Sequence, residues 1–296
     1  MSARLRRHTA AAGLGVSALL LAACGGGGGN DTAGGEGRLD QLRDDGTITV
    51  GFAGEAPYSF MGEDGELAGA SVALQEKIWG ELGIENVEGV QAEFGQLIQG
   101  LNAGRFDIVA AGMSILPERC DQALFSDPEF QYTTALMVPA GNPNDLSDMQ
   151  SIAESGVTMA AMTGAIESGY ASSLDISPLQ VGNPQDGMDA VTNGRADVFA
   201  LTGISLNWMA ENAGNDSIEV TESFVAVIDD VEQVGAGGTV FRQDDTELRD
   251  AYNEKLAEVT ADDDAYLDVV GDWGFTAAER PAGDLTTEQL CSGELG

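Results

Sequence analysis

Arg119 is the residue whose type and position most directly suggest chemistry, because it follows a predicted buried strand. The apolar residues 108–111 are typical of a strand inside a parallel sheet. Pro117 is suited to the first turn of a helix, so we expect Arg119 in that turn. Ligands of open α/β sheets bind beyond the carboxyl ends of the strands, which is where Arg119 stands.

A positive side chain in the first helical turn opposes the helix dipole, at a typical cost of ~0.3–1 kcal/mol. One interpretation is that the guanidinium group and the free N–H groups at the helix start together hold a ligand carboxylate. The other is an arginine that is solvated in a turn or paired with Glu118. The local sequence does not decide between them.

The elements that must position Arg119 alternate between strand and helix along the chain, which is the pattern of an α/β fold. Apolar residues at helical spacing predict helices over 71–82 and 246–259. Strands are predicted at residues 48–52, 87–91, 108–111, 136–138, 157–160, 179–181, 198–200, 218–220 and 239–241.

One segment occurs twice: Gly104–Ala110, GRFDIVA, is followed ninety residues later by Gly194–Ala200, GRADVFA. Each copy follows a predicted helix and leads into an apolar strand. A helix–turn–strand unit in each half favours two similar α/β lobes. A chance similarity between two ordinary helix ends is the alternative.

Two segments rich in turn residues, 139–143 and 235–238, are expected to carry the chain between the lobes. Two crossings form a paired hinge, which suits closure around a ligand. We expect the first part of lobe 1 at 39–138, lobe 2 at 139–237, and the return to lobe 1 with a C-terminal segment at 238–296.

The N-terminus has the features of a secretory signal. Three arginines precede the apolar run 13–22, which is too short to span a bilayer. The run ends in Leu-Ala-Ala-Cys, which resembles the bacterial lipobox and implies removal of residues 1–23 and a lipid on Cys24. Residues 24–38 predict a flexible tether. We expect a lipid-anchored protein on the extracellular face of the cell membrane, with an uncleaved signal anchor as the alternative.

The composition excludes several functions. The formal net charge is −36, and without residues 1–23 ten basic residues remain against 49 acidic ones, a charge of −39. Such a surface repels nucleic acid and anionic lipid. Because His8 is the only histidine, the chain after the signal has none for a catalytic triad or for most zinc sites. We expect no metal, no cofactor and no nucleic-acid partner.

Cys120 and Cys291 are the two cysteines besides Cys24. In an exported chain two such thiols favour a disulfide, which for so long a loop contributes ~4–5 kcal/mol in the chain-entropy model. It would tie the last segment to lobe 1. The alternative is two separate buried thiols.

Four segments together resemble the extracellular solute-binding proteins of ABC importers, in the branch that binds polar amino acids. They are Thr47–Gly51, Gly100–Arg119, Phe125–Pro128 and Gly194–Ala200. The resemblance implies a two-lobed periplasmic-binding-protein fold with a ligand cleft between the lobes. It also implies that Arg119 binds the carboxylate of the ligand.

The chain departs from that branch where an acid normally holds the α-ammonium group of an amino acid. The strand after the second Gly-Arg turn ends in Leu201-Thr202. A buried ammonium group without a carboxylate is costly. We therefore expect a ligand without an ordinary α-amino group.

Within the branch the chain is most similar to the ectoine- and hydroxyectoine-binding proteins, on its Pro-Glu-Arg-Cys segment and its second cysteine near the C-terminus. This implies that Glu55 meets the cationic ring and that Tyr58 and Phe94 pack its faces, with core packing as the alternative for both aromatics. Ser114 stands where a third aromatic is expected. The expected ligand contacts are Glu55, Tyr58, Phe94, Ser114, Arg119, Gly164, Ala165 and Thr202.

We expect a monomeric lipoprotein that captures a small zwitterionic compatible solute, ectoine or hydroxyectoine, and delivers it to an ABC permease without chemistry. One alternative is a binding protein for another polar amino acid or a betaine. Another is a dehydratase on the same fold, in which Glu55 would act as acid or base. A sensor ectodomain is a third.

Overall fold

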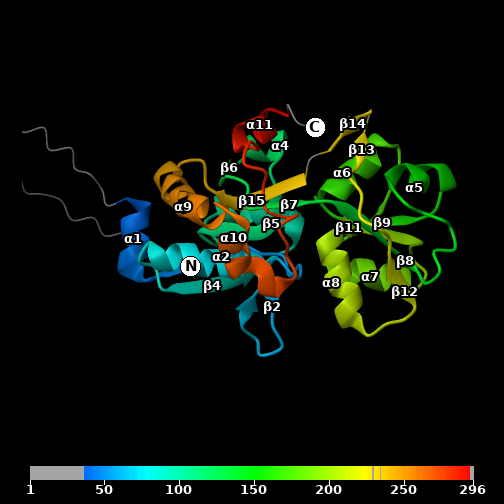
Figure 1. The fold of residues 1–296 in the computed structure, drawn as a ribbon, viewed down its shortest axis with the longest axis horizontal. Coiled ribbons are helices and arrows are strands. Elements are labelled where there is room, and N and C mark those ends of the chain that lie inside the picture. Colours follow the sequence, from blue (N-terminus) through cyan, green and yellow to red (C-terminus); the bar gives the residue numbers. More distant parts are fainter. Residues whose placement is uncertain (1–36, 229, 234, 294–296) are drawn as a thin grey trace, which may run out of the picture. The chain divides into compact units, whose positions relative to one another are not determined.

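Two separate β-sheets organise the chain, and each carries its own helices (Figure 1). The computed structural model describes residues 37–228, 230–233 and 235–293. The expected two-lobed α/β architecture is confirmed, with lobe 1 built on the first sheet and lobe 2 on the second.

The sheet of lobe 1 has the strand order β4-β1-β5-β15-β6, and β7 also pairs with β15. Strands β1, β4 and β5 are parallel, while β15 returns from the far end of the chain and runs antiparallel to β5. The strands are β1 (Thr47–Phe52), β4 (Asn86–Gln91), β5 (Ile108–Ser114), β6 (Leu124–Phe125), β7 (Phe130–Tyr132) and β15 (Gly235–Phe241), with a hairpin of β2 (Phe60–Met61) and β3 (Leu67–Ala68). The helices are α1 (Arg38–Asp45), α2 (Ala70–Glu81), α3 (Leu97–Asn102), α4 (Pro117–Cys120), α9 (Thr246–Val259), α10 (Asp263–Val270) and α11 (Thr287–Ser292), with short 3₁₀ turns at Phe94–Gln96 and Gly271–Trp273.

The sheet of lobe 2 has the order β10-β9-β11-β8-β12, in which β8 is antiparallel to both of its neighbours. Its strands are β8 (Thr134–Pro139), β9 (Met159–Met162), β10 (Leu179–Val181), β11 (Val198–Thr202) and β12 (Ile218–Val220). The helices are α5 (Met149–Ser155), α6 (Ile166–Ser173), α7 (Pro184–Thr192) and α8 (Gly203–Ala213), and a small hairpin pairs β13 (Val227–Ile228) with β14 (Val231–Glu232).

The two copies of the Gly-Arg segment have the same local structure in the two lobes. The glycine that begins each copy has a positive φ, 72° and 67°, a conformation common after the last turn of a helix. In lobe 1 the Asp107 carboxylate accepts a hydrogen bond from the Thr49 backbone N–H at 2.9 Å. In lobe 2 the Asp197 carboxylate accepts one from the Thr158 N–H at 2.8 Å. Each aspartate ties the new strand to its neighbour, so the two copies have the same structural role in their lobes.

The first crossing between the lobes lies before β8, and the crossing expected at residues 139–143 is wrong. Strand β8 pairs with β11 and β12, so it already belongs to lobe 2. The segment that follows is a turn, in which Gly141 has a φ of 80° and Asn142 one of 38°. Proline, glycine and asparagine mark a turn within a lobe as readily as a connection between lobes.

The second crossing lies before Gly235 and not within residues 235–238, because β15 begins at Gly235 and runs through all four. A Cβ atom on Gly235 would stand 2.6 Å from the Tyr132 carbonyl oxygen, and one on Gly238 would stand 2.6 Å from Ser126 Oγ. These glycines permit close approach of neighbouring backbone and side chains. They do not interrupt the strand.

Cys120 and Cys291 form a disulfide, as expected. The bond joins α4 to α11, so the C-terminal helix is held against lobe 1 (Figure 1). The alternative of two separate thiols is wrong.

Glu129 is a buried acid of the lobe 1 interior. Its Oε1 accepts hydrogen bonds from the Tyr252 hydroxyl at 2.7 Å and from the Thr239 backbone N–H at 3.0 Å. Burial raises the pKa of Glu129 to about 7, although these hydrogen bonds lower it. This network joins the loop before β7 to β15 and α9, and so has a structural role.

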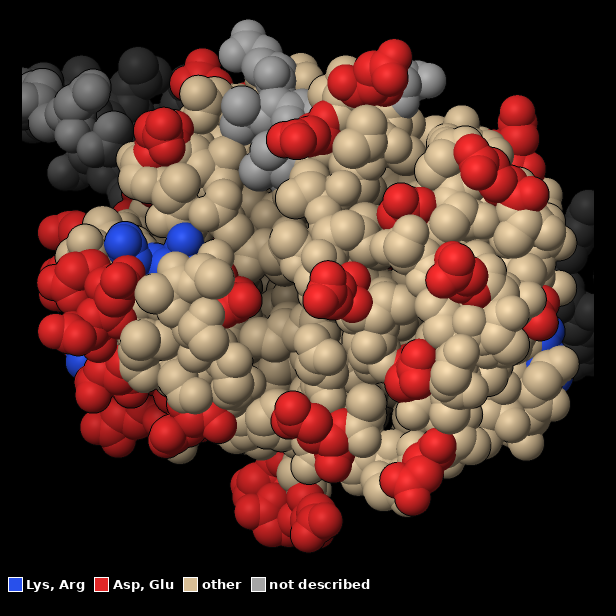
Figure 2. All heavy atoms as spheres, turned by 45° about the vertical axis from the view of Figure 1, so that its right-hand side comes forward, with Lys and Arg blue, Asp and Glu red and all other residues tan. Residues whose placement is uncertain are grey.

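Acidic side chains are spread over the face shown in Figure 2, where lysine and arginine are few. The predicted signal peptide, Cys24 and the tether up to residue 36 lie outside the described residues. Among the residues that are described, every helix is too short or too polar to cross a membrane.

Candidate functional site

Glu55 is a buried acid that connects the two lobes. It follows β1 at the carboxyl end of that strand and is 3% exposed. Its Oε1 accepts a hydrogen bond from Ser205 Oγ at 2.7 Å, and Thr202 Oγ1 lies 3.5 Å away. Burial raises the pKa of Glu55 to about 7 against the opposing effect of these hydroxyls. Because Thr202 ends β11 and Ser205 lies in the first turn of α8, this contact joins lobe 1 to lobe 2.

Arg119 is the second buried charge that connects the lobes. It is 7% exposed, so a solvated arginine is ruled out. Nη1 donates to the Ser114 carbonyl at 2.7 Å within lobe 1, and Nη2 donates to the Gly164 carbonyl of lobe 2 at 2.6 Å. The guanidinium carbon lies 5.5 Å from the centre of the Phe94 ring, a cation–π distance. Burial lowers the pKa of this group from its usual value.

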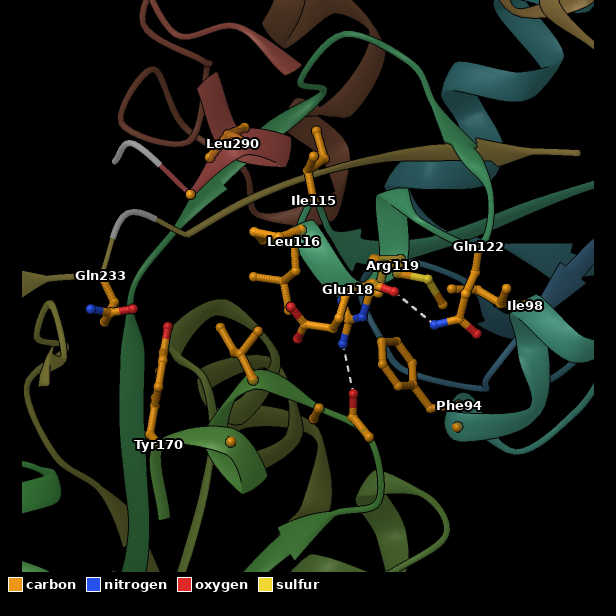
Figure 3. A pocket seen from close by; sticks show the side chains of 18 of the residues that line it. Phe94, Ile98, Ile115, Leu116, Glu118, Arg119, Gln122, Tyr170, Gln233 and Leu290 are labelled. Carbon is orange, nitrogen blue, oxygen red and sulfur yellow. Dashed lines mark hydrogen bonds between the residues drawn. The ribbon is translucent and has the colours of Figure 1, made fainter. Parts of the chain in front are cut away.

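A cavity of about 500 Å³ lies beside Arg119. In Figure 3, Arg119 and Phe94 lie next to each other, with Tyr170 of α6 across the cavity. Its walls come from both lobes, with α4 and α11 on one side and α6 on the other. Four of the eight expected contacts line this cavity: Phe94, Arg119, Gly164 and Ala165. The other four belong to the adjoining group of buried side chains: Glu55, Tyr58, Ser114 and Thr202.

Tyr58 packs as a core residue with a free polar end. Its ring meets Phe130, Phe275 and Tyr132 edge to face, with centroid distances of 5.4, 5.6 and 6.3 Å. The hydroxyl group is buried, and among the described residues it has no hydrogen-bond partner. Burial raises its pKa well above the usual value. The ring therefore fills the core of lobe 1, and the Thr202 side chain of lobe 2 acts on its hydroxyl group.

Tyr132 is an aromatic of this region that the sequence reasoning missed. Its hydroxyl donates a hydrogen bond to Ser114 Oγ. Tyr132 of β7 therefore lies beside Ser114, the position at which an aromatic of β5 was expected. The sequence indicated Tyr132 only through its position at the end of a strand, next to the first connection between the lobes. That connection was expected at residues 139–143, so the signal was missed.

Glu167 is a second buried acid that the sequence reasoning missed. It lies in the first turn of α6 and is 1% exposed. Its pKa is raised to about 8, chiefly by burial and also by the charge of Glu55, while a hydrogen bond to its own backbone N–H and the charge of Arg119 act to lower it. The sequence reasoning looked for an acid of lobe 2 at Thr202, whereas the buried acid of this lobe lies in the first turn of α6. An acid soon after the turn Gly164-Ala165, at the carboxyl end of β9, was the available signal.

Comparison with known proteins places these features in context. The family model described as bacterial extracellular solute-binding proteins, family 3, matches residues 48–268. A probable amino-acid ABC transporter periplasmic-binding protein of Sinorhizobium fredii is 33% identical over 261 residues, 86% of each chain. A cyclohexadienyl dehydratase of Pseudomonas aeruginosa is 28% identical over 137 residues, 46% of this chain and 51% of the dehydratase.

Among solved structures, EhuB in complex with hydroxyectoine has a TM-score of 0.76 at 30% identity. The match covers 86% of this chain and 97% of EhuB. It confirms the periplasmic-binding-protein fold expected from the sequence.

Proposed function

Because the chain belongs to the bacterial extracellular solute-binding proteins of family 3, we propose that it captures ectoine or hydroxyectoine for an ABC transporter. The family and the relatives support a binding component for polar amino acids or related solutes. The specificity for ectoine or hydroxyectoine is narrower than what the family and the relatives support. The observation that carries it is that a buried acid, Glu55, and a buried cation, Arg119, each bond across the two lobes, with the Phe94 ring against Arg119.

The chemistry of the solute matches this arrangement. Ectoine is a compact ring with one carboxylate and a cation delocalised over an amidinium group. Arg119 holds the carboxylate by charge-assisted hydrogen bonds. Glu55 meets the amidinium group, Phe94 and Tyr132 supply aromatic surface around the cation, and Tyr58 reaches the solute with its hydroxyl group. Gly164, Ala165 and Thr202 are the contacts proposed from lobe 2.

Solute binding is transmitted to the transporter by closure of the lobes. Hydrogen bonds of Glu55 to Ser205 and of Arg119 to Gly164 join the lobes. A solute that occupies both charged groups stabilises this closed arrangement. The membrane permease then recognises the closed protein, which carries out no chemistry and works as a monomer.

The proposal includes a lipid anchor at Cys24, which keeps the protein at the extracellular face of the cell membrane. Its test is expression of the full chain in a bacterial host, followed by fractionation. The wild type is expected in the membrane fraction with a lipid-modified N-terminal cysteine by mass spectrometry. Release of wild type and Cys24→Ala in equal amounts would rule out the anchor.

An enzyme is the second candidate, because a dehydratase is among the relatives and burial raises the pKa of Glu55 to about 7. A carboxyl group with such a pKa can act as a general acid or base at neutral pH. Incubation with ectoine, followed by NMR, separates the two functions. Binding alone leaves the spectrum of the recovered solute unchanged, whereas a new product would favour the enzyme.

A thermal-shift screen followed by isothermal titration calorimetry tests the specificity. The panel contains ectoine, hydroxyectoine, glycine betaine, L-glutamate, L-glutamine and L-arginine. The two ectoines are expected to raise the melting temperature and to bind with micromolar or tighter affinity. Binding of glutamate, glutamine or arginine, together with no binding of either ectoine, would refute the specificity and leave the transport function standing.

A further inference from the structure

Glu167 is a buried acid that the function proposed above does not use. Its carboxyl group is buried, and within the described part of the chain its Oε1 has no hydrogen-bond partner. A buried polar atom without a partner costs free energy. Such an atom is rare in native proteins, and its presence needs a specific explanation.

Glu167 lies in the part of the chain that forms one wall of the cavity, between Ile166 and Gly169, which both line it. Helix α6, in which it occupies the first turn, begins just after Gly164, the residue that accepts a hydrogen bond from Arg119. The charged groups that act on Glu167 are Glu55 of the segment after β1 and Arg119 of α4. Glu167 in turn affects the phenol groups of Tyr132 in β7 and Tyr170 in α6. Acid groups from both lobes therefore share one buried region.

We propose that Glu167 contacts the bound solute from lobe 2 and that, together with Glu55, it decides how much positive charge the site accepts. The proposal concerns the same site as the proposed function and rests on that function for the identity of the solute.

The number of buried charges determines whether a carboxyl group must bind a proton when the solute binds. Glu55 and Glu167 are two acids, and Arg119 is the one arginine beside them. A solute with one carboxylate and one cation would leave three negative and two positive groups in the closed site. One carboxyl group must then bind a proton, because an unbalanced buried charge is costly. A solute with two cations would balance both acids without a proton.

Glu167 is the group expected to hold that proton. Burial raises the pKa of Glu167 to about 8 and that of Glu55 to about 7, and the proposed contact of Glu55 with the cation of the solute favours the charged form of Glu55. With the lobes apart and the carboxyl group in water, the pKa of Glu167 returns toward an ordinary value of about 4.3. Closure on a zwitterion therefore takes up a proton at pH values between these two pKa values. Binding then weakens as the pH increases, and the Kd rises by up to about tenfold for each unit of pH.

Three variants test the proposal. Glu167→Gln keeps the shape and removes the titration, and Glu167→Ala removes the group. Glu154→Gln on α5 is the matched control, because it removes an exposed acid from the same lobe. Kd is measured by calorimetry at pH 6, 7 and 8 with ectoine, hydroxyectoine, L-arginine and L-glutamine, after thermal unfolding has shown that each variant is folded.

With ectoine, Glu167→Ala is expected to bind about tenfold or more weakly at pH 6. Glu167→Gln is expected to stay within about threefold of the wild type at pH 6 and to lose the pH dependence, because a neutral amide replaces the protonated acid. Glu154→Gln should match the wild type. Folded Glu167→Ala with an affinity within about twofold of the wild type overturns the proposal, as does Glu167→Gln with an unchanged pH dependence.

The panel separates a failure of this proposal from a failure of the ectoine specificity. If the wild type binds arginine or glutamine but no ectoine, the specificity fails and the variants are compared with that solute. For arginine, which carries two cations, Glu167→Gln is then expected to weaken binding by about tenfold or more, and an unchanged Kd overturns the proposal. If the wild type binds none of the four solutes, both proposals fail.

Discussion

Replacement of Arg119 by alanine is expected to abolish tight binding of the solute while the protein stays folded. The side chain donates to the carbonyl oxygens of Ser114 and Gly164 and packs over Phe94. Its removal would leave the solute carboxylate buried without a cation. Loss of one partner of a buried, hydrogen-bonded charge pair costs ~2–5 kcal/mol, which corresponds to an increase of the Kd by about 30-fold to several thousand-fold.

Arg119→Lys refines this prediction. Lysine keeps the charge but presents it as a single point, so it cannot reach two carbonyl oxygens and a carboxylate at once. We expect an affinity between those of the wild type and Arg119→Ala. Arg105→Ala is the matched control, because it removes an exposed arginine from the same lobe and is expected to leave the Kd unchanged.

Calorimetry with ectoine, paired with thermal unfolding of the solute-free proteins, provides the measurement. The unfolding curves establish that each variant is folded before its Kd is compared. A folded Arg119→Ala protein that binds within about threefold of the wild type would refute the reasoning, since the loss of a buried charge pair lowers the binding free energy by more than a threefold change in Kd represents. An equal loss in Arg105→Ala would show that the effect is one of net charge and not of position.

Three further predictions concern stability, measured by urea denaturation. Removal of the disulfide in the double variant Cys120→Ala/Cys291→Ala should lower the free energy of unfolding by roughly 2–5 kcal/mol, and an unchanged value would contradict this. Because the folded pKa of Glu129 is raised to about 7, the protein should become more stable as the pH falls from 7 toward 5, by up to roughly 3 kcal/mol from this group. Glu129→Gln should show a smaller pH slope, and an equal slope would exclude the assignment. Gly235→Ala should destabilise by ~1–3 kcal/mol, since its Cβ meets the carbonyl oxygen of Tyr132, whereas Gly80→Ala in open space on α2 should not destabilise.

Local pattern was enough to locate many of the elements. The helix α9 and the strands β10 and β12 have the bounds expected from hydrophobic periodicity. The repeated Gly-Arg segment predicted two related lobes, because each copy contains its own turn glycine and aspartate. These features depend on neighbours close in sequence, so the amino-acid sequence by itself determines them.

The crossings between the lobes could not be located in the same way. Turn residues at 139–143 and glycines at 235–238 carry the same local signal whether they connect lobes, form a turn or line a tightly packed strand. Which of these applies depends on the strand that pairs with each segment. Pairing is a long-range property that local propensity does not contain.

The residues of the candidate site also differ in whether the local sequence reveals them. Arg119 was recognisable because a buried strand and a helix start meet at one point of the sequence. Tyr132 and Glu167 were not, because each reaches the site only after chain folding brings β7 and α6 to the same buried region as Glu55. The sequence by itself determined the two lobes and the place of Arg119 at the end of a strand, while its burial came from the structure. Only the tertiary structure decided that a second acid shares the site, because burial and charge coupling arise between residues far apart in the chain.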